Sequence, residues 1–145
     1  MNYDALNIAQ YIIDYCNKNN LSVNNLKLQT LLYFVWIHYY KQTGKILFDD
    51  NFSARQLGPA VSEVYYEYCP WGGIHIFRRY EVPLLLEDKT TIDECLAKEA
   101  LFPLCSLSEK SRKQCGAWNT IYKDGSGDSL IIPQKIIIDL ECRTA

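Results

Sequence analysis

The sequence predicts a mainly α-helical domain with a small β component, an α+β fold, packed around a buried central helix at about residues 25–41. The main observation is the run from Asn24 to Tyr40, where apolar side chains fall on every side of a helical wheel. A helix that is apolar all round is buried in a core or spans a membrane. Polar residues interrupt this run well short of the about 18 apolar residues of a membrane span, so we expect a buried helix and no membrane association.

A strand is the alternative for this run. Its length, its leucine-rich composition and the pair Asn24-Asn25, which suits a helix N-cap, favour the helix. The second observation is an amphipathic pattern over residues 4–19, with Asp4 as a candidate N-cap and Asp14 on the polar side. The apolar face of this first helix consists of Ala5, Ile8, Ala9, Ile12, Ile13 and Cys16. The short connection at residues 21–23 then predicts an antiparallel or angled helix pair.

Length and charge restrict the class of protein. The chain has 145 residues, which suits one domain spanning residues 1–145. Its net charge of −2 argues against a protein that is basic overall for nucleic acid. The N-terminus shows no basic segment followed by the apolar run of a signal peptide. The six cysteines show no metal-ligand spacing, so we expect free thiols and a cytoplasmic location.

Turn residues divide the chain after the central helix. Gly44 suits the position just past its C-terminus. After a turn at residues 49–51, we expect Phe52, Ala54 and Leu57 to return the chain to the core. Pro59 suits the first position of a third helix. Residues 69–73 end that helix, and the partly alternating residues 74–80 predict a strand. The apolar stripe of the third helix comprises Val61, Val64, Tyr65 and Tyr68.

The second half of the chain shows shorter signals. A turn at residues 87–89 precedes a helix over residues 91–104, which Pro103 ends or kinks. Residues 107–122 contain a short helix with Ala117 and Trp118 buried, together with Ile121 and Tyr122. Residues 130–132 are apolar and extended, and Pro133 opens a final helix.

Four segments form a pattern when they are taken in order. They are LNIAQYIIDYC near the N-terminus, LKLQTLLYF in the central helix, LFDDNFSARQLGPAVSEVY after it, and CGAWNTIY followed by LIIPQKI. This pattern resembles the Panacea domain family, also described as SocA-like antitoxins or phage-associated GepA-like proteins. The second segment is close to the family's LKLQKLLYF, and the third is similar to its LF…A…GPV…VY. These two segments are specific in combination.

The resemblance implies a mostly helical domain that takes part in bacterial toxin–antitoxin pairs, often on phages and mobile elements. In such pairs the domain binds and neutralises a toxin, and some members resemble adaptors that hand the toxin to a protease. The family has no assigned catalytic residues. This chain departs from the pattern at Thr30, where the family usually has Lys, and at Ser111-Arg112, where it usually has Ser-His. Residues from about 79 to 106 match no part of it.

Aromatic residues around the third helix are the candidates for binding a partner protein. Tyr65, Tyr66 and Trp71 offer large contact area at low entropy cost. Such residues in a helical stripe are at least as often core, and Tyr66, opposite the buried stripe, is the one we expect to be exposed. Arg78 and Arg79 form a basic-aromatic patch for an acidic toxin surface or a nucleic acid backbone. Two arginines on a solvated strand edge are the alternative.

The motifs indicate a protein that is not an enzyme and needs no cofactor or metal. We expect His38 to be a hydrogen-bonded structural residue, because no Ser or Cys nucleophile lies in a recognisable signature. Gly58-Pro59 lacks the glycine-rich loop and Lys of a phosphate-binding loop. We therefore expect an antitoxin that binds a cognate toxin. The alternatives are a nucleic-acid-binding regulator of a mobile element, which needs a basic recognition helix, and a small hydrolase, which needs a pocket of perturbed titrating groups.

Overall fold

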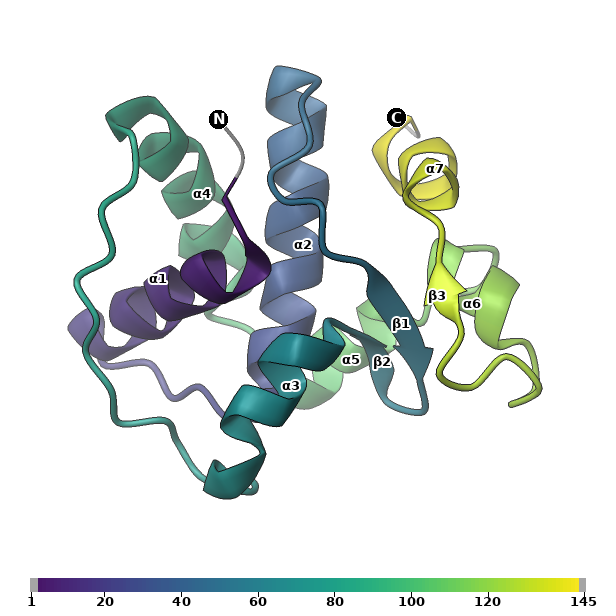
Figure 1. The fold of residues 1–145 in the computed structure, drawn as a ribbon, viewed down its shortest axis with the longest axis horizontal. Coiled ribbons are helices and arrows are strands. Elements are labelled where there is room, and N and C mark those ends of the chain that lie inside the picture. The colour runs from purple at the N-terminus through teal and green to yellow at the C-terminus, as the bar shows by residue number, and fades with distance from the viewer. Residues whose placement is uncertain (1–2, 144–145) are drawn as a thin grey trace.

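Helix α2 (Asn25–Thr43) stands at the centre of the fold, and the other elements surround it (Figure 1). The computed structural model describes residues 3–143 and confirms a mainly helical α+β fold. The other α-helices are α1 (Ala5–Lys18), α3 (Ser62–Tyr68), α4 (Leu86–Glu99), α5 (Leu104–Ser111), α6 (Ala117–Tyr122) and α7 (Gln134–Ile137). A 3-10 turn, η1 (Cys69–Trp71), follows α3, and a π-helical turn, η2 (Ile138–Cys142), follows α7.

The predicted burial of α2 is confirmed. Its largest side chains, Tyr33 and Trp36, are fully buried, and they lie on different sides of the helix from Leu28 and Leu31, which are also fully buried. The side chain of Asn24 caps the first turn by accepting a hydrogen bond from the backbone N–H of Lys27. Gly44 ends the helix with φ of 72°, a conformation that favours glycine.

Helix α1 crosses α2 at an angle, and its predicted apolar face is buried (Figure 1). Asp4 caps it by accepting from the backbone N–H of Asn7. The expectation that Asp14 faces solvent is wrong, because this residue is only 4% exposed. Its carboxylate accepts the backbone N–H groups of Tyr80 and Glu81 at 2.8 and 2.7 Å. A buried carboxylate needs such partners.

The segment at residues 74–80 is extended but forms no strand, so that prediction is wrong. Its backbone groups bond to α1 and to the α1–α2 connection instead of to a neighbouring strand. The N–H of Ile76 donates to the carbonyl of Val23, and the side-chain amide of Asn17 donates to the carbonyls of Ile76 and Arg78. The alternating sequence pattern of residues 74–80 therefore occurs here in an extended segment that is not paired in a sheet.

The small sheet instead forms from β1 (Phe52–Arg55), β2 (Gly58–Ala60) and β3 (Ile131–Ile132), in the order β2-β1-β3 with antiparallel pairs. Pro59 pairs with Ala54 in the edge strand β2, and α3 begins only at Ser62, so the predicted helix start at Pro59 is wrong. A proline, which lacks a backbone N–H, is tolerated on an edge strand. Gly58 has φ of 134°, and a Cβ there would lie 2.7 Å from Ser111 Oγ.

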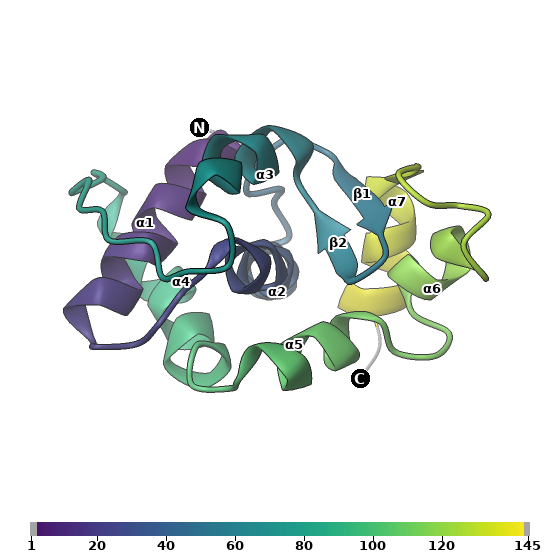
Figure 2. The ribbon, with the colours of Figure 1, turned by 90° about the horizontal axis from the view of Figure 1, so that it is seen from below.

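The second half of the chain contains helices in the predicted order, but their boundaries differ from the predicted ones. Helix α4 begins five residues before the predicted Thr91, and Glu87 and Asp88 lie in its first turn, where negative charge is favourable. The predicted helix over 91–104 is divided, because α4 ends at Glu99 and α5 begins at Leu104 and extends into the segment 107–122. Figure 2 looks along α2 and shows α3 and α5 on opposite sides of it, with α1 and α4 to the left and the sheet and α7 to the right. No helix within residues 3–143 is long and apolar enough to span a bilayer.

Candidate protein-binding surface

Two polar side chains on α2 hold the β1–β2 hairpin and α3 in place. The side-chain amide of Asn25 donates to the carbonyl of Tyr65 at 3.0 Å, and its side-chain oxygen accepts from Gln29 at 3.0 Å. Gln29 Oε1 in turn accepts the backbone N–H of Val61, which directly precedes α3, at 3.0 Å. Both α2 side chains are at least 96% buried. This buried chain of hydrogen bonds fixes α3 against the N-terminal end of α2.

Arg55, at the end of β1, lies under the two tyrosines of α3. Its guanidinium carbon is 4.8 Å from the ring centroid of Tyr65 and 5.6 Å from that of Tyr66. Nη2 donates to Ser62 Oγ at 3.2 Å, whereas Nε is buried and has no hydrogen-bond partner among the described residues. Tyr66 is 63% exposed. The cluster of Arg55, Tyr65 and Tyr66 therefore presents an exposed aromatic ring beside a donor that lacks an acceptor.

An apolar groove of about 360 Å³ adjoins this cluster. Leu26 of α2, Leu57 of the hairpin tip and Leu104 of α5 form its apolar wall. Leu26 and Leu57 also line a smaller hollow whose other walls include Arg55 and Tyr65, so the groove continues to the aromatic cluster. The hydroxyl of Ser108 donates to the carbonyl of Leu57 at 2.6 Å, which ties the hairpin tip to α5. We call the groove and the cluster together the hairpin surface.

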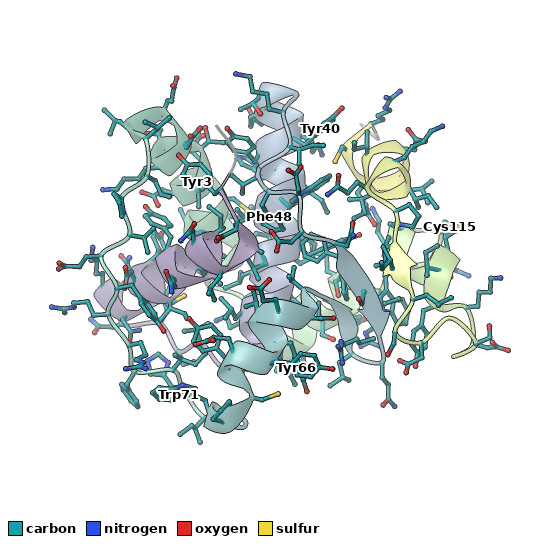
Figure 3. All side chains as sticks on the ribbon, in the orientation of Figure 1. Tyr3, Tyr40, Phe48, Tyr66, Trp71 and Cys115 are labelled. Atoms are coloured by element: carbon teal, nitrogen blue, oxygen red, sulfur yellow. The ribbon has the colours of Figure 1, made fainter. Side chains whose placement is uncertain are left out.

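The structure places the five predicted binding residues in three regions. Tyr65 and Tyr66 belong to the hairpin surface. Trp71, in η1, is half-buried and packs against the core, and Figure 3 shows it beyond the C-terminal end of α3, away from Tyr66. Arg78 and Arg79 are exposed in the segment beside the C-terminal end of α1.

Sequence reasoning missed Arg55, Leu26, Leu57 and Leu104. Leu57 was expected in the core, but it is 50% exposed because it occupies the two-residue turn between β1 and β2. The hairpin had one usable signal, the glycine at position 58, which accepts the positive φ that a tight turn requires. Leu26 and Leu104 carried no such signal, because their exposure depends on where α5 lies.

The two histidines differ in their contacts. The ring of His75 accepts the backbone N–H of Val23 at Nδ1, so Nε2 carries the proton and donates to Asn17 Oδ1 at 2.7 Å. The expected hydrogen bonding of His38 is not observed at Nε2, which is buried without a partner in the described chain. Burial lowers the pKa of His38.

All six cysteines are free thiols. Burial raises the pKa of Cys16 and Cys142 to about 11 and that of Cys95 to about 12. These three thiols therefore stay protonated near neutral pH, and the thiolate is the nucleophilic form of cysteine. Cys69, by contrast, lies exposed at the surface.

Comparisons with models of protein families, with curated proteins and with solved structures each find no match. The resemblance to the Panacea domain family stays a prediction that rests on the order of the four segments. The hydrogen bond between Gln29 and Val61 joins the two most specific of these segments, LKLQTLLYF and LFDDNFSARQLGPAVSEVY.

Proposed function

We propose that this domain is an antitoxin-like protein-binding module that neutralises a partner toxin of a bacterial or phage toxin–antitoxin system by direct complex formation. The observation that carries the proposal is the hairpin surface. It combines exposed Tyr66, the stacked Arg55 and an apolar groove. Tyrosine and arginine are enriched in the residues that dominate the binding energy of protein interfaces, and such residues lie in or beside pockets.

The residues of the hairpin surface indicate which kind of toxin segment would bind there. Apolar side chains of the toxin would fill the groove between Leu57 and Leu104. A carboxylate or a backbone carbonyl beside them would accept from Arg55 Nε, whose burial without an acceptor is costly in the free domain. Neutralisation would then be steric, because the domain covers the active surface of the toxin. Proteolysis of the domain, or delivery of the toxin to a protease, would set the outcome in the cell.

The first test is co-expression of the tagged domain with the neighbouring gene, with growth followed in parallel and the complex recovered by pull-down. We expect the neighbour to be toxic alone and to form a stoichiometric complex that restores growth. Tyr66→Ala and Leu57→Ser should each abolish rescue without loss of the folded domain. Leu86→Ala is the matched control, since this side chain is 78% exposed at the start of α4, outside the hairpin surface. A harmless neighbour that does not bind would contradict the proposal.

The second candidate is a nucleic-acid-binding regulator, and the exposed run Phe77-Arg78-Arg79 favours it. Phe77 is 73% exposed beside the two arginines, and an exposed ring with neighbouring cations is a platform for stacking bases. Binding of DNA that falls steeply with salt and is lost in the double variant Arg78→Ala and Arg79→Ala would support this function. Retention of toxin binding in the same double variant would separate the two activities.

A further inference from the structure

A second hollow lies at the other end of α2 and is unrelated to the hairpin surface. This cleft has a volume of about 400 Å³ and is bounded by α2, α4, α5 and η2. Its apolar lining includes Phe34 and Ile37 of α2. Leu26 of the hairpin surface and His38 of the cleft are twelve residues apart on the same helix, about 18 Å along its axis. The volume is in the range of small-molecule sites.

Two buried polar atoms in the cleft lack partners. Glu99 is 5% exposed, and its Oε1 accepts from Lys110 Nζ at 2.6 Å. Its other oxygen, Oε2, is buried and has no hydrogen-bond partner within residues 3–143. The same holds for Nε2 of His38, which lines the same cleft. Buried polar atoms in native proteins are nearly always paired, so two unpaired atoms in one cleft point to a ligand that supplies hydrogen bonds.

Both unpaired atoms can accept hydrogen bonds, so the ligand must supply a donor. A carboxylate oxygen accepts hydrogen bonds only, so the missing group at Glu99 must be an N–H or an O–H. Burial lowers the pKa of His38, so the ring is neutral near pH 7 and one of its nitrogens accepts. An ammonium group has three donors and no acceptor. It therefore suits both atoms.

Four lysines and one glutamate, Glu94, form the exposed part of the cleft lining. Lys41 and Lys98 line the cleft, are exposed, and form no ion pair within the described part of the chain. Lys110 and Lys113 also line it, with side chains 48% and 47% exposed, although each is paired with a buried glutamate. An anionic group at the opening would meet two unpaired ammonium groups. The cleft thus has unpaired acceptors inside, and lysines outnumber carboxylates at its exposed edge.

We propose that this cleft binds a small zwitterion, such as an amino acid or its phosphate ester. The ligand's ammonium group donates hydrogen bonds to Glu99 Oε2 and His38 Nε2, and its carboxylate or phosphate contacts Lys41 and Lys98. The site does not depend on the proposed toxin binding, because it shares no residue with the hairpin surface.

The test is a titration of the ¹⁵N-labelled domain with four probes, followed by NMR. Glutamate and O-phosphoserine carry both charges, putrescine carries only ammonium groups, and succinate carries only carboxylates. We expect both zwitterions to bind at millimolar concentration or tighter, with shifts at His38 and Glu99. Putrescine and succinate should bind at least tenfold more weakly. Absence of binding by both zwitterions overturns the proposal.

Variants separate the two ends of the site. Glu99→Gln should weaken zwitterion binding at least tenfold, and the double variant Lys41→Gln and Lys98→Gln should do the same from the exposed opening, where folding is not at risk. Glu87→Gln is the matched control, because this glutamate is exposed on the same helix as Glu99. If succinate binds as tightly as the zwitterions and Glu99→Gln changes nothing, the cleft is only an anion-attracting surface and the proposal fails.

Discussion

Gln29 Oε1 accepts the backbone N–H of Val61 at 3.0 Å across 32 positions of sequence. The bond joins the central helix to the residue between β2 and α3, and it is buried on both sides. Val61 is the N-cap residue of α3, and its own side chain makes no capping hydrogen bond. The glutamine of α2 therefore serves as the cap for the neighbouring helix and sets the position of the hairpin surface.

Replacing Gln29 should destabilise the domain. In Gln29→Leu the N–H of Val61 remains buried without an acceptor, and Asn25 loses its donor, so we expect a loss of about 1–3 kcal/mol in the free energy of unfolding. Urea denaturation followed by circular dichroism measures the change. Gln42→Leu, at the exposed end of α2, is the matched control. Equal stability of the two variants would show that the cap is not needed.

Asp14 should anchor the segment that precedes α4. Asp14→Ala removes the acceptor of the N–H groups of Tyr80 and Glu81, so we expect both amides to exchange with solvent at least tenfold faster in NMR hydrogen exchange. Asp124→Ala, in an exposed loop, is the control. Unchanged protection at both amides would mean that other contacts hold the segment.

Stability should fall on the alkaline side because of buried thiols. Burial raises the pKa of Cys95 from 9.0 to about 12, so the folded state binds this proton more tightly than the unfolded chain does. The resulting stability is fully present below about pH 9 and is lost as pH rises through the folded pKa of about 12. Buried tyrosines contribute in the same direction from about pH 9 upward, because the unfolded side chain, with a pKa of about 10, begins to ionise there.

The melting temperature measured between pH 8 and pH 9 reports mainly on the thiols. We expect Cys95→Ala to reduce the slope of this decline, whereas Cys105→Ala, which alters an exposed thiol, should retain it. Identical slopes in wild type and Cys95→Ala would refute the assignment.

Arg55 should bind the partner through its planar guanidinium rather than through charge alone. Arg55→Lys keeps the charge but loses the stacking on Tyr65 and Tyr66 and the Nε donor. We expect the proposed toxin partner to dissociate at least tenfold faster in surface plasmon resonance, with little change in association rate. Lys45→Arg, at an exposed site after α2, is the control, because it exchanges the same two residue types in the opposite direction outside the hairpin surface. Normal dissociation from Arg55→Lys would exclude stacking as the source of affinity.

Local pattern was enough to predict much of the fold. The apolar faces of α1 and α2, their caps at Asp4 and Asn24, and the exposed position of Tyr66 follow from residue types at helical spacing. These features depend on neighbours within one or two turns, and such neighbours are fixed by the sequence itself.

Two of the errors share one cause. The predicted strand at 74–80 failed because its backbone groups bond to partners far away in the sequence, at Val23 and Asn17. The predicted helix start at Pro59 failed for a local reason, because Pro59 pairs with Ala54 in a tight hairpin. Asp14 looked like a solvated charge on the polar side of α1, yet it bonds to residues 66 and 67 positions later. No local spacing encodes such pairings.

The sequence by itself determined that this chain forms a mainly helical α+β domain around a buried helix, since periodicity and capping are local properties. Only the tertiary structure decided which candidates meet. It joined Tyr65 and Tyr66 to Arg55, moved Arg78 and Arg79 to the side of α1, and assembled the cleft around Glu99 from elements as distant as α2 and η2. The physical reason is that a binding surface depends on how helices pack, and packing brings together residues from distant parts of the chain.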